Sequence, residues 1–269
     1  VSAMELSVDG RKVFAATGGK PFDPSLPAVV FVHGAAADHT VWKLQTRYFA
    51  WHGHGVLAVD MPAHGRSDGP LIPTIEGLAD WLIAVLDAAG LETAALVGHS
   101  VGSLVTLEAA ARYPDRVSAL ALLGCAVPMR VNDELLSAAR ANEHLANRLT
   151  NAWGYGRAAQ RGQHAVPGMW MMAGGMRLLE DADDGVLYND MNACHQYEGG
   201  ETAAQKLTCP TLSIMGERDM MTPIKQARKL VQQINGAKEA VIEGAGHIMM
   251  DETPDATLDA LRDFLPAPS

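Results

Sequence analysis

The sequence has few cysteines and no surplus of positive charge. Its three cysteines, Cys125, Cys194 and Cys209, are odd in number and show neither a CxxC pair nor a Cys/His spacing suited to a metal. This pattern argues against a disulfide framework, and we expect a protein of the reducing cytoplasm. Lys and Arg total 21 against 31 Asp and Glu, a formal net charge of −10, and they form no basic stripe. Binding to a nucleic acid is therefore not expected.

Long apolar runs are also missing. No stretch approaches the roughly 20 apolar residues that a membrane-spanning helix needs, so we expect no membrane association. Residues 1–10 alternate polar and apolar side chains and lack the basic and apolar regions of a secretion signal. What the chain does have is 269 residues with 48% hydrophobic content. That is enough for one large α/β domain with a sizeable core, as a monomer or a homodimer.

Continuous apolar runs alternate with helical patterns along most of the chain. The segment 28–32 is apolar throughout, as expected for a strand buried on both faces of a parallel sheet. Thr74 can cap a helix that Gly90 ends, because apolar residues between them recur every three or four positions. We predict strands at 28–32, 56–61, 94–98, 117–124, 211–215 and 239–242, and helices at 40–51, 75–89, 101–113, 223–234 and 255–264. This order predicts an α/β fold with a doubly wound, mostly parallel sheet.

The stretch from residue 128 to about residue 206 interrupts this alternation. It contains no run of β-branched apolar residues, and residues 135–149 show helical spacing ahead of Gly-, Trp- and Met-rich segments. The strand pattern returns directly after Cys209. We therefore predict a core formed by residues 1–127 and 207–269, with a helical cap inserted over residues 128–206.

Ser100 stands between two glycines directly after an apolar run, in the sequence Gly98-His99-Ser100-Val101-Gly102. This layout predicts a strand, a tight turn and a helix, with the serine hydroxyl exposed above the sheet in a strained backbone conformation. Bulky side chains at the two glycine positions would block the turn. Ser100 is therefore a candidate nucleophile, although a hydroxyl needs a base at neutral pH.

A candidate acid and a candidate base follow two later strands. Asp219 comes after the predicted strand 211–215, and His247 comes after the predicted strand 239–242. Because the carboxyl ends of parallel strands meet at one edge of a sheet, we expect both side chains near Ser100. An imidazole can take the serine proton, and a carboxylate can fix the tautomer of that imidazole. The order Ser, Asp, His with a G-x-S-x-G turn resembles the α/β-hydrolase superfamily.

The resemblance extends over nearly the whole chain. The sequence His33-Gly34-Ala35 is similar to the oxyanion loop of that superfamily, which implies that the backbone N–H groups of Ala35 and Val101 hold the oxyanion. Residues 60–67 are similar to its D-x-P-G-H-G-x-S loop, with Ala63 where glycine is usual. The resemblance further implies a helical cap after the sixth strand and hydrolysis through an acyl-enzyme. It implies no metal and no organic cofactor.

The predicted cap is rich in methionine, whose flexible side chain fits irregular apolar shapes. We therefore expect a pocket for a small apolar ester. Met220 and Ile248 adjoin the candidate acid and base, and Trp170 lies in the Met-rich segment, so these three residues are predicted to line the pocket. The methionines of the cap are Met129, Met169, Met171, Met172, Met176 and Met191.

Several activities within the superfamily can be compared residue by residue. Haloalkane dehalogenases and epoxide hydrolases use an aspartate where this chain has Ser100. Carbon–carbon bond hydrolases typically show an H-G-G-G-P-G loop and a Trp after the base, where this chain has residues 35–37 (A-A-A) and Ile248. Hydrolysis of a carboxylic ester, thioester or lactone is the leading hypothesis. Carbon–carbon cleavage, cofactor-free haloperoxidase chemistry and a noncatalytic module that binds a small ligand stay open beside it.

Overall fold

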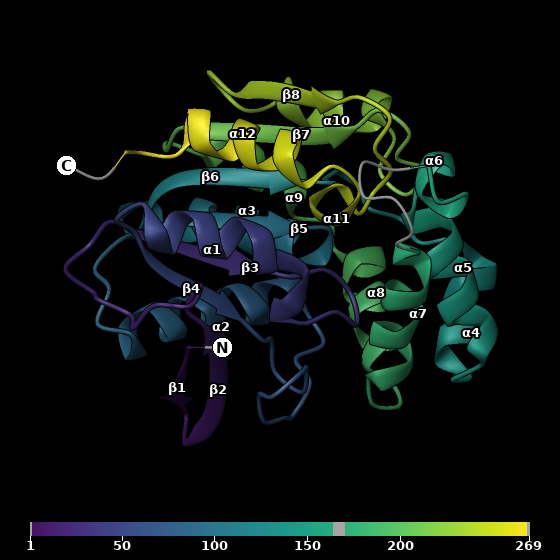
Figure 1. Cartoon of the computed structure of the whole chain (residues 1–269), viewed down its shortest axis with the longest axis horizontal. Coiled ribbons are helices and arrows are strands. Elements are labelled where there is room, and N and C mark those ends of the chain that lie inside the picture. The colour runs from purple at the N-terminus through teal and green to yellow at the C-terminus, as the bar shows by residue number, and fades with distance from the viewer. Residues whose placement is uncertain (1, 164–169, 268–269) are drawn as a thin grey trace.

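The computed structural model describes residues 2–163 and 170–267. Within these residues, eight strands form one sheet in the order β1-β2-β4-β3-β5-β6-β7-β8. The pairs β1/β2 and β2/β4 are antiparallel, and the other neighbouring strands are parallel. The predicted doubly wound, mostly parallel sheet is therefore confirmed (Figure 1). The strands are β1 (Ala3–Val8), β2 (Arg11–Ala16), β3 (Ala28–Val32), β4 (Gly55–Val59), β5 (Ala94–His99), β6 (Val117–Leu123), β7 (Thr211–Gly216) and β8 (Lys238–Ile242).

Helices cover both faces of the sheet, which explains why its central strands are apolar throughout. All residues of β3, β4 and β5 are buried. One face packs against α1 (Lys43–Trp51), α11 (Met249–Glu252) and α12 (Pro254–Phe264). The other face packs against α2 (Ile75–Ala88), α3 (Val101–Arg112) and α10 (Ile224–Val231). Each fully buried Leu, Val or Phe in these two layers contributes about 1.5–3 kcal/mol to folding.

The N-terminal hairpin is the part of the sheet that the sequence prediction did not assign. β1 and β2 are joined by Asp9 and Gly10, which both have positive φ values, 50° and 75°. An Asp-Gly pair with two positive φ values is the two-residue turn that matches the twist of a hairpin. The Asp-Gly signal and the alternation of residues 1–10 together indicate the hairpin.

The chain between β6 and β7 forms helices that gather at the carboxyl edge of the parallel strands (Figure 1). The helical spacing over residues 135–149 divides into two helices at Asn142, whose φ is 52°. The last helix of the segment packs against α3 in the same apolar layer as α2, and we call the helices α4 to α8 the cap. The helices are α4 (Asp133–Arg140), α5 (His144–Gly154), α6 (Arg157–Gln160), α7 (Met171–Asp181), α8 (Val186–Gln196) and α9 (Gly200–Lys206).

No helix formed by the described residues is both long enough and apolar enough to cross a lipid bilayer.

Candidate active site

Ser100 lies at the carboxyl end of β5, on the tight turn into α3. Its backbone has a φ of 54° and a ψ of −120°, a conformation that costs a residue with a Cβ about 1–3 kcal/mol. Its N–H donates to the carbonyl of Leu123 at 3.0 Å, which anchors the turn to β6. A Cβ on Gly98 would lie 2.3 Å from the carbonyl oxygen of Gly102, and a Cβ on Gly102 would lie 2.4 Å from that of His33. The strained turn therefore requires both glycines.

His247 and Asp219 meet at the same edge of the sheet, after β8 and β7. Nδ1 of His247 lies 2.8 Å from Oδ2 of Asp219, and the two residues are only 2% and 6% exposed. Because a carboxylate oxygen only accepts, Nδ1 carries the proton and Nε2 presents a lone pair. Nε2 is buried and has no hydrogen-bond partner in the described part of the chain. Ser100 and His247 line one cavity, so this lone pair is available to act as a base there.

The Asp219 carboxylate is held by several donors besides the imidazole. Oδ1 accepts from the N–H groups of Met221 and Thr222, each at 2.8 Å, and Oδ2 accepts from the Thr222 hydroxyl at 2.6 Å. Burial by itself would raise the pKa of Asp219, but attraction to His247 and these hydrogen bonds lower it below its usual range. Asp219 is therefore ionised and can stabilise a positive charge on the imidazole.

Two hydrogen bonds fix the position of the His247 backbone. Nε2 of His99 lies 2.9 Å from the carbonyl oxygen of His247, and the His247 N–H donates to the carbonyl of Gly154 at 2.8 Å. Burial, followed by the nearness of His247, lowers the pKa of His99 to about 3, so His99 is neutral and donates from Nε2. A Cβ on Gly124, whose φ is 56°, would lie 2.8 Å from Cε1 of His247. The glycine at the end of β6 therefore makes room for the base.

The loop after β3 lies directly beside Ser100. A Cβ on Gly34 would lie 3.3 Å from the Cβ of Ser100, and Ala35 lines the same cavity. Val101 is the first residue of α3, and its side chain is fully buried, so only its backbone N–H can face a substrate. The amino end of α3 also carries a partial positive charge. The structure thus brings both predicted N–H donors to the edge where Ser100 lies.

A group of possible metal ligands lies in the loops after β3 and β4, at Asp38, His39 and Asp60. Oxygen atoms of both carboxylates are already in use. Asp60 accepts from the N–H groups of His39 and Arg66 and faces Nδ1 of His39 at 2.9 Å, and Asp38 accepts from Thr40. These contacts organise the loops, and the carboxylates of this group are occupied by protein donors.

A cavity of about 760 Å³ lies between the cap and the sheet edge. Of the three predicted pocket residues, Ile248 and Trp170 line it. Trp170 is 61% exposed, which places it at the rim. The prediction for Met220 is wrong: its side chain is 68% exposed and Met221 lines the cavity instead. The turn that Asp219 caps directs Met220 away from the cavity, and adjacency in sequence could not show this. The predicted cap residue Met169 lies outside the described residues.

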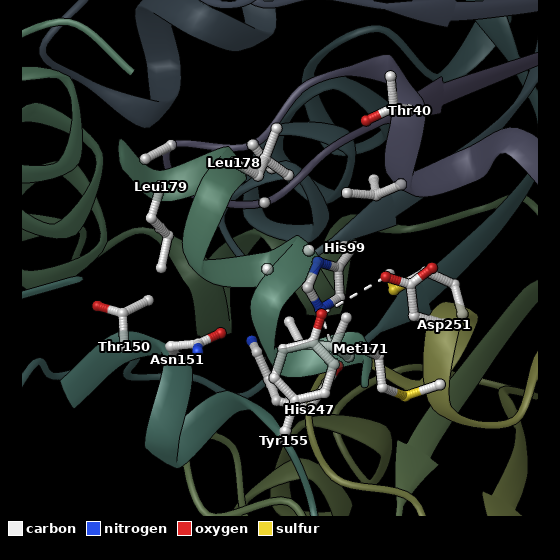
Figure 2. A pocket seen from close by; sticks show the side chains of 18 of the residues that line it. Thr40, His99, Thr150, Asn151, Tyr155, Met171, Leu178, Leu179, His247 and Asp251 are labelled. Carbon is white, nitrogen blue, oxygen red and sulfur yellow. Dashed lines mark hydrogen bonds between the residues drawn. The ribbon is translucent and has the colours of Figure 1, made fainter. Parts of the chain in front are cut away.

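Polar side chains also line the cavity, and sequence reasoning missed them. Thr150, Asn151 and Tyr155 face it from α5 and the residue after α5 (Figure 2). The Tyr155 hydroxyl points toward Asp251 at 3.5 Å. Burial raises the pKa of Tyr155 well above its ordinary value, and burial likewise raises the pKa of Asp251. No pattern in the cap sequence distinguishes these residues from solvent-facing polar ones, because their placement depends on how the cap packs.

The chain matches the model of the alpha/beta hydrolase family over residues 29–260. This match covers most of the chain, so the protein belongs to the alpha/beta hydrolase family. The fold and the edge site of Ser100, Asp219 and His247 agree with that assignment.

Similarity to individual proteins is moderate. The chain is 26% identical to Protein ABHD8 of Mus musculus over 240 residues, which is 87% of this chain and 54% of that protein. It therefore spans about half the length of that relative. A solved thermophilic esterase is 27% identical, with a TM-score of 0.81 over 98% of this chain and 97% of the other. The enol-lactonase of Burkholderia xenovorans LB400 has a TM-score of 0.86 at 23% identity over 97% of this chain and 99% of the other, a likeness of fold.

Proposed function

We propose that the protein is a serine hydrolase that cleaves a carboxylic ester, thioester or lactone of a small, largely apolar molecule through an acyl-enzyme. One observation carries the proposal. Ser100 on its strained turn and His247, locked by Asp219 into the tautomer with a free Nε2, line one cavity together with Ala35. A nucleophile, a base and an oxyanion site are the parts that acyl transfer requires.

In the first half of the proposed reaction, the Ser100 oxygen attacks the carbonyl carbon while Nε2 of His247 takes the hydroxyl proton. The negative charge that forms on the carbonyl oxygen is stabilised by the N–H groups of Ala35 and Val101. The bond to the leaving oxygen, or to the leaving sulfur of a thioester, then breaks, and His247 gives its proton to that atom. Asp219 stabilises the imidazolium between the two proton transfers.

In the second half, a water molecule attacks the acyl-enzyme. Nε2 of His247 accepts the proton of the water, and the same two N–H groups stabilise the second oxyanion. When the bond to Ser100 breaks, the serine oxygen recovers its proton from His247. The carboxylic acid is released and the enzyme returns to its starting state.

The cavity supports a small substrate with a mainly apolar body. Its volume of about 760 Å³ lies within the range of small-molecule sites. The apolar part of the cavity surface includes the side chains of Met171, Met221 and Ile248, and the methionines can adapt to irregular shapes. On the cap side, Asn151 and Tyr155 form a polar part of the surface. The likeness to a thermophilic esterase over nearly all of both chains also supports ester cleavage.

The decisive variant is Ser100→Ala, compared with the exposed control Ser137→Ala. Removing the nucleophile of a group that acts as a unit lowers kcat by about four orders of magnitude or more. We expect that loss for Ser100→Ala on p-nitrophenyl butyrate, and normal turnover for Ser137→Ala. A fluorophosphonate probe should label the wild type and the control and leave Ser100→Ala unlabelled.

Near-normal turnover by Ser100→Ala would overturn the proposal. An unlabelled wild type that binds an apolar ligand tightly would instead support the noncatalytic binding module. A panel of esters, thioesters and lactones of varied acyl length, together with a carbon–carbon bond substrate and a haloperoxidase assay, separates the remaining activities.

A further inference from the structure

Asp190, a buried residue of the cap, contacts the loop that carries Ala35. It lies on α8 and is 1% exposed. Its Oδ2 accepts from the N–H of Ala36 at 2.9 Å and also lies 2.8 Å from Nε2 of His64. Ala36 follows β3 and His64 follows β4, so one carboxylate joins the cap to two loops of the core.

The contacts of His64 require a positively charged ring. Nδ1 lies 3.0 Å from the carbonyl oxygen of Pro62, and Nε2 lies 2.8 Å from the carboxylate of Asp190. Both partners are acceptors, so both ring nitrogens carry a proton. Burial alone would lower the pKa of His64, but the charge of Asp190 raises it above its ordinary value. Attraction to His64 likewise outweighs burial and lowers the pKa of Asp190. The pair is a buried imidazolium–carboxylate ion pair.

The Ala36 contact acts on a strained turn. The N–H of Ala37 donates to the carbonyl of Gly34 at 3.3 Å, which closes a four-residue turn with Ala35 and Ala36 at its centre. Ala36 has a φ of 48°, although a positive φ at the third position of a turn favours glycine. Without an acceptor for the Ala36 N–H, the peptide group between Ala35 and Ala36 is free to rotate toward a turn conformation that alanine prefers. Ala35 precedes that peptide, so its own position depends on the rotation.

We propose that Asp190, paired with His64, is a positioning residue that holds the Gly34–Ala37 turn in the conformation in which the Ala35 N–H can stabilise the oxyanion. The cap thereby contributes to the oxyanion site as well as to the pocket. This inference rests on the proposed acyl transfer. It adds a residue that the predicted set of Ser100, Asp219 and His247 does not contain.

Two titratable groups next to the ion pair are neutral. The His33 ring packs against His64, with ring centroids 5.0 Å apart. Burial, followed by the nearness of His64, lowers the pKa of His33 to about 4, so His33 is neutral. Burial keeps the thiol of Cys194, one turn along α8 from Asp190, neutral by raising its pKa. The other charged groups around the pair and the small cavity beside it are Asp38, Asp60, Arg66, Asp181 and Asp183.

The test compares Asp190→Ala and Asp190→Asn with the control Tyr197→Phe. Tyr197 follows α8 and donates to Glu108 of α3, so the control removes another buried bond between the same segment and the core without touching the turn. Losing one oxyanion donor costs about 10² to 10³ in kcat. We expect Asp190→Ala to lower kcat on p-nitrophenyl butyrate by about 10-fold to 100-fold with KM changed less than about threefold. Tyr197→Phe should retain kcat.

Asp190→Asn is the rescue variant. Its amide oxygen, at the position of Oδ2, can accept from the N–H of Ala36 and from Nε2–H of a neutral His64, so kcat should return to within a few-fold of wild type. In the wild type, kcat should fall at alkaline pH as His64 loses its proton and leaves Asp190 unpaired. Asp190→Asn should lack that alkaline fall. Wild-type kcat in Asp190→Ala, or the same alkaline fall in Asp190→Asn, would overturn the inference.

Hydrogen exchange at the Ala36 amide tests the contact without using activity. We expect exchange at least about tenfold faster in Asp190→Ala than in the wild type and unchanged in Tyr197→Phe. Equal exchange in wild type and Asp190→Ala would also overturn the inference. Failure of the proposed function shows separately, as a wild type without turnover that depends on Ser100.

Discussion

Gly124 controls how closely His247 can approach the end of β6. Its φ is 56°, and a Cβ at this position would lie 2.8 Å from Cε1 and 2.9 Å from Nδ1 of the imidazole. Nδ1 is also the atom that binds Asp219. A side chain at residue 124 would therefore disturb the base and its bond to the acid together.

We expect Gly124→Ala to lower kcat by about tenfold or more, since misplacing a catalytic group by about 1 Å can cost 10²-fold. Gly236→Ala is a matched control, because Gly236 has a φ of 70° and a Cβ there would meet nothing within 4 Å. Both variants bear the strain of a positive φ and should lose about 1–2 kcal/mol of stability. Only Gly124→Ala should lose activity, as measured by steady-state kinetics and thermal unfolding. Equal kcat in the two variants would show that the imidazole adapts.

At the scale of elements, α11 joins the cap to the loop that carries His247. Glu252 on α11 is 6% exposed, and its two carboxylate oxygens accept from the N–H of Gly156 at 2.8 Å and that of Gly246 at 3.1 Å. Gly156 lies between α5 and α6 of the cap, and Gly246 directly precedes His247. This carboxylate therefore couples the position of the base to the seating of the cap.

We expect Glu252→Gln to lower the free energy of unfolding by about 1–3 kcal/mol, because its NH2 group would face one of two buried N–H donors. Glu217→Gln is the matched control, since Glu217 accepts from the N–H of Gly244 in the same loop at an exposed position. That control should change stability by less than about 0.5 kcal/mol. Denaturant unfolding followed by tryptophan fluorescence checks both values. A loss of stability in Glu217→Gln equal to that in Glu252→Gln would contradict this role of the Glu252 carboxylate.

At the scale of the whole molecule, two buried histidines link stability to pH. Burial is the largest cause that lowers the pKa of His33 to about 4 and that of His99 to about 3. In the unfolded chain a histidine has a pKa of about 6.5. Below that pH the unfolded state therefore binds protons that the folded state does not bind. Their contribution to stability is full above pH 6.5 and is lost as the pH falls toward 4 and 3. His64 changes stability with pH in the opposite direction, because its raised pKa adds stability that is lost at alkaline pH.

We therefore expect the midpoint temperature of unfolding, measured by calorimetry, to decrease as the pH is lowered from 7 to 5. Replacing one buried neutral histidine, in His99→Gln, should reduce the slope of stability against pH by up to about 1.4 kcal/mol per pH unit. The exposed control His52→Gln should leave the slope unchanged. A midpoint that does not change from pH 7 to pH 5 would contradict this account.

The sequence by itself determined the parallel part of the sheet and the order in which Ser100, Asp219 and His247 follow its strands. Buried parallel strands must be apolar on both faces, so segments such as β3 and β5 were predictable from composition alone. The placement of Ser100, Asp219 and His247 after three strand ends was predictable because a turn between glycines and two strand ends are local features. Only the tertiary structure decided which side chains meet across the seam between cap and core. The exposure of Met220, the ion pair of Asp190 with His64, and the room that Gly124 leaves all depend on contacts between residues far apart in the chain, which no local pattern records.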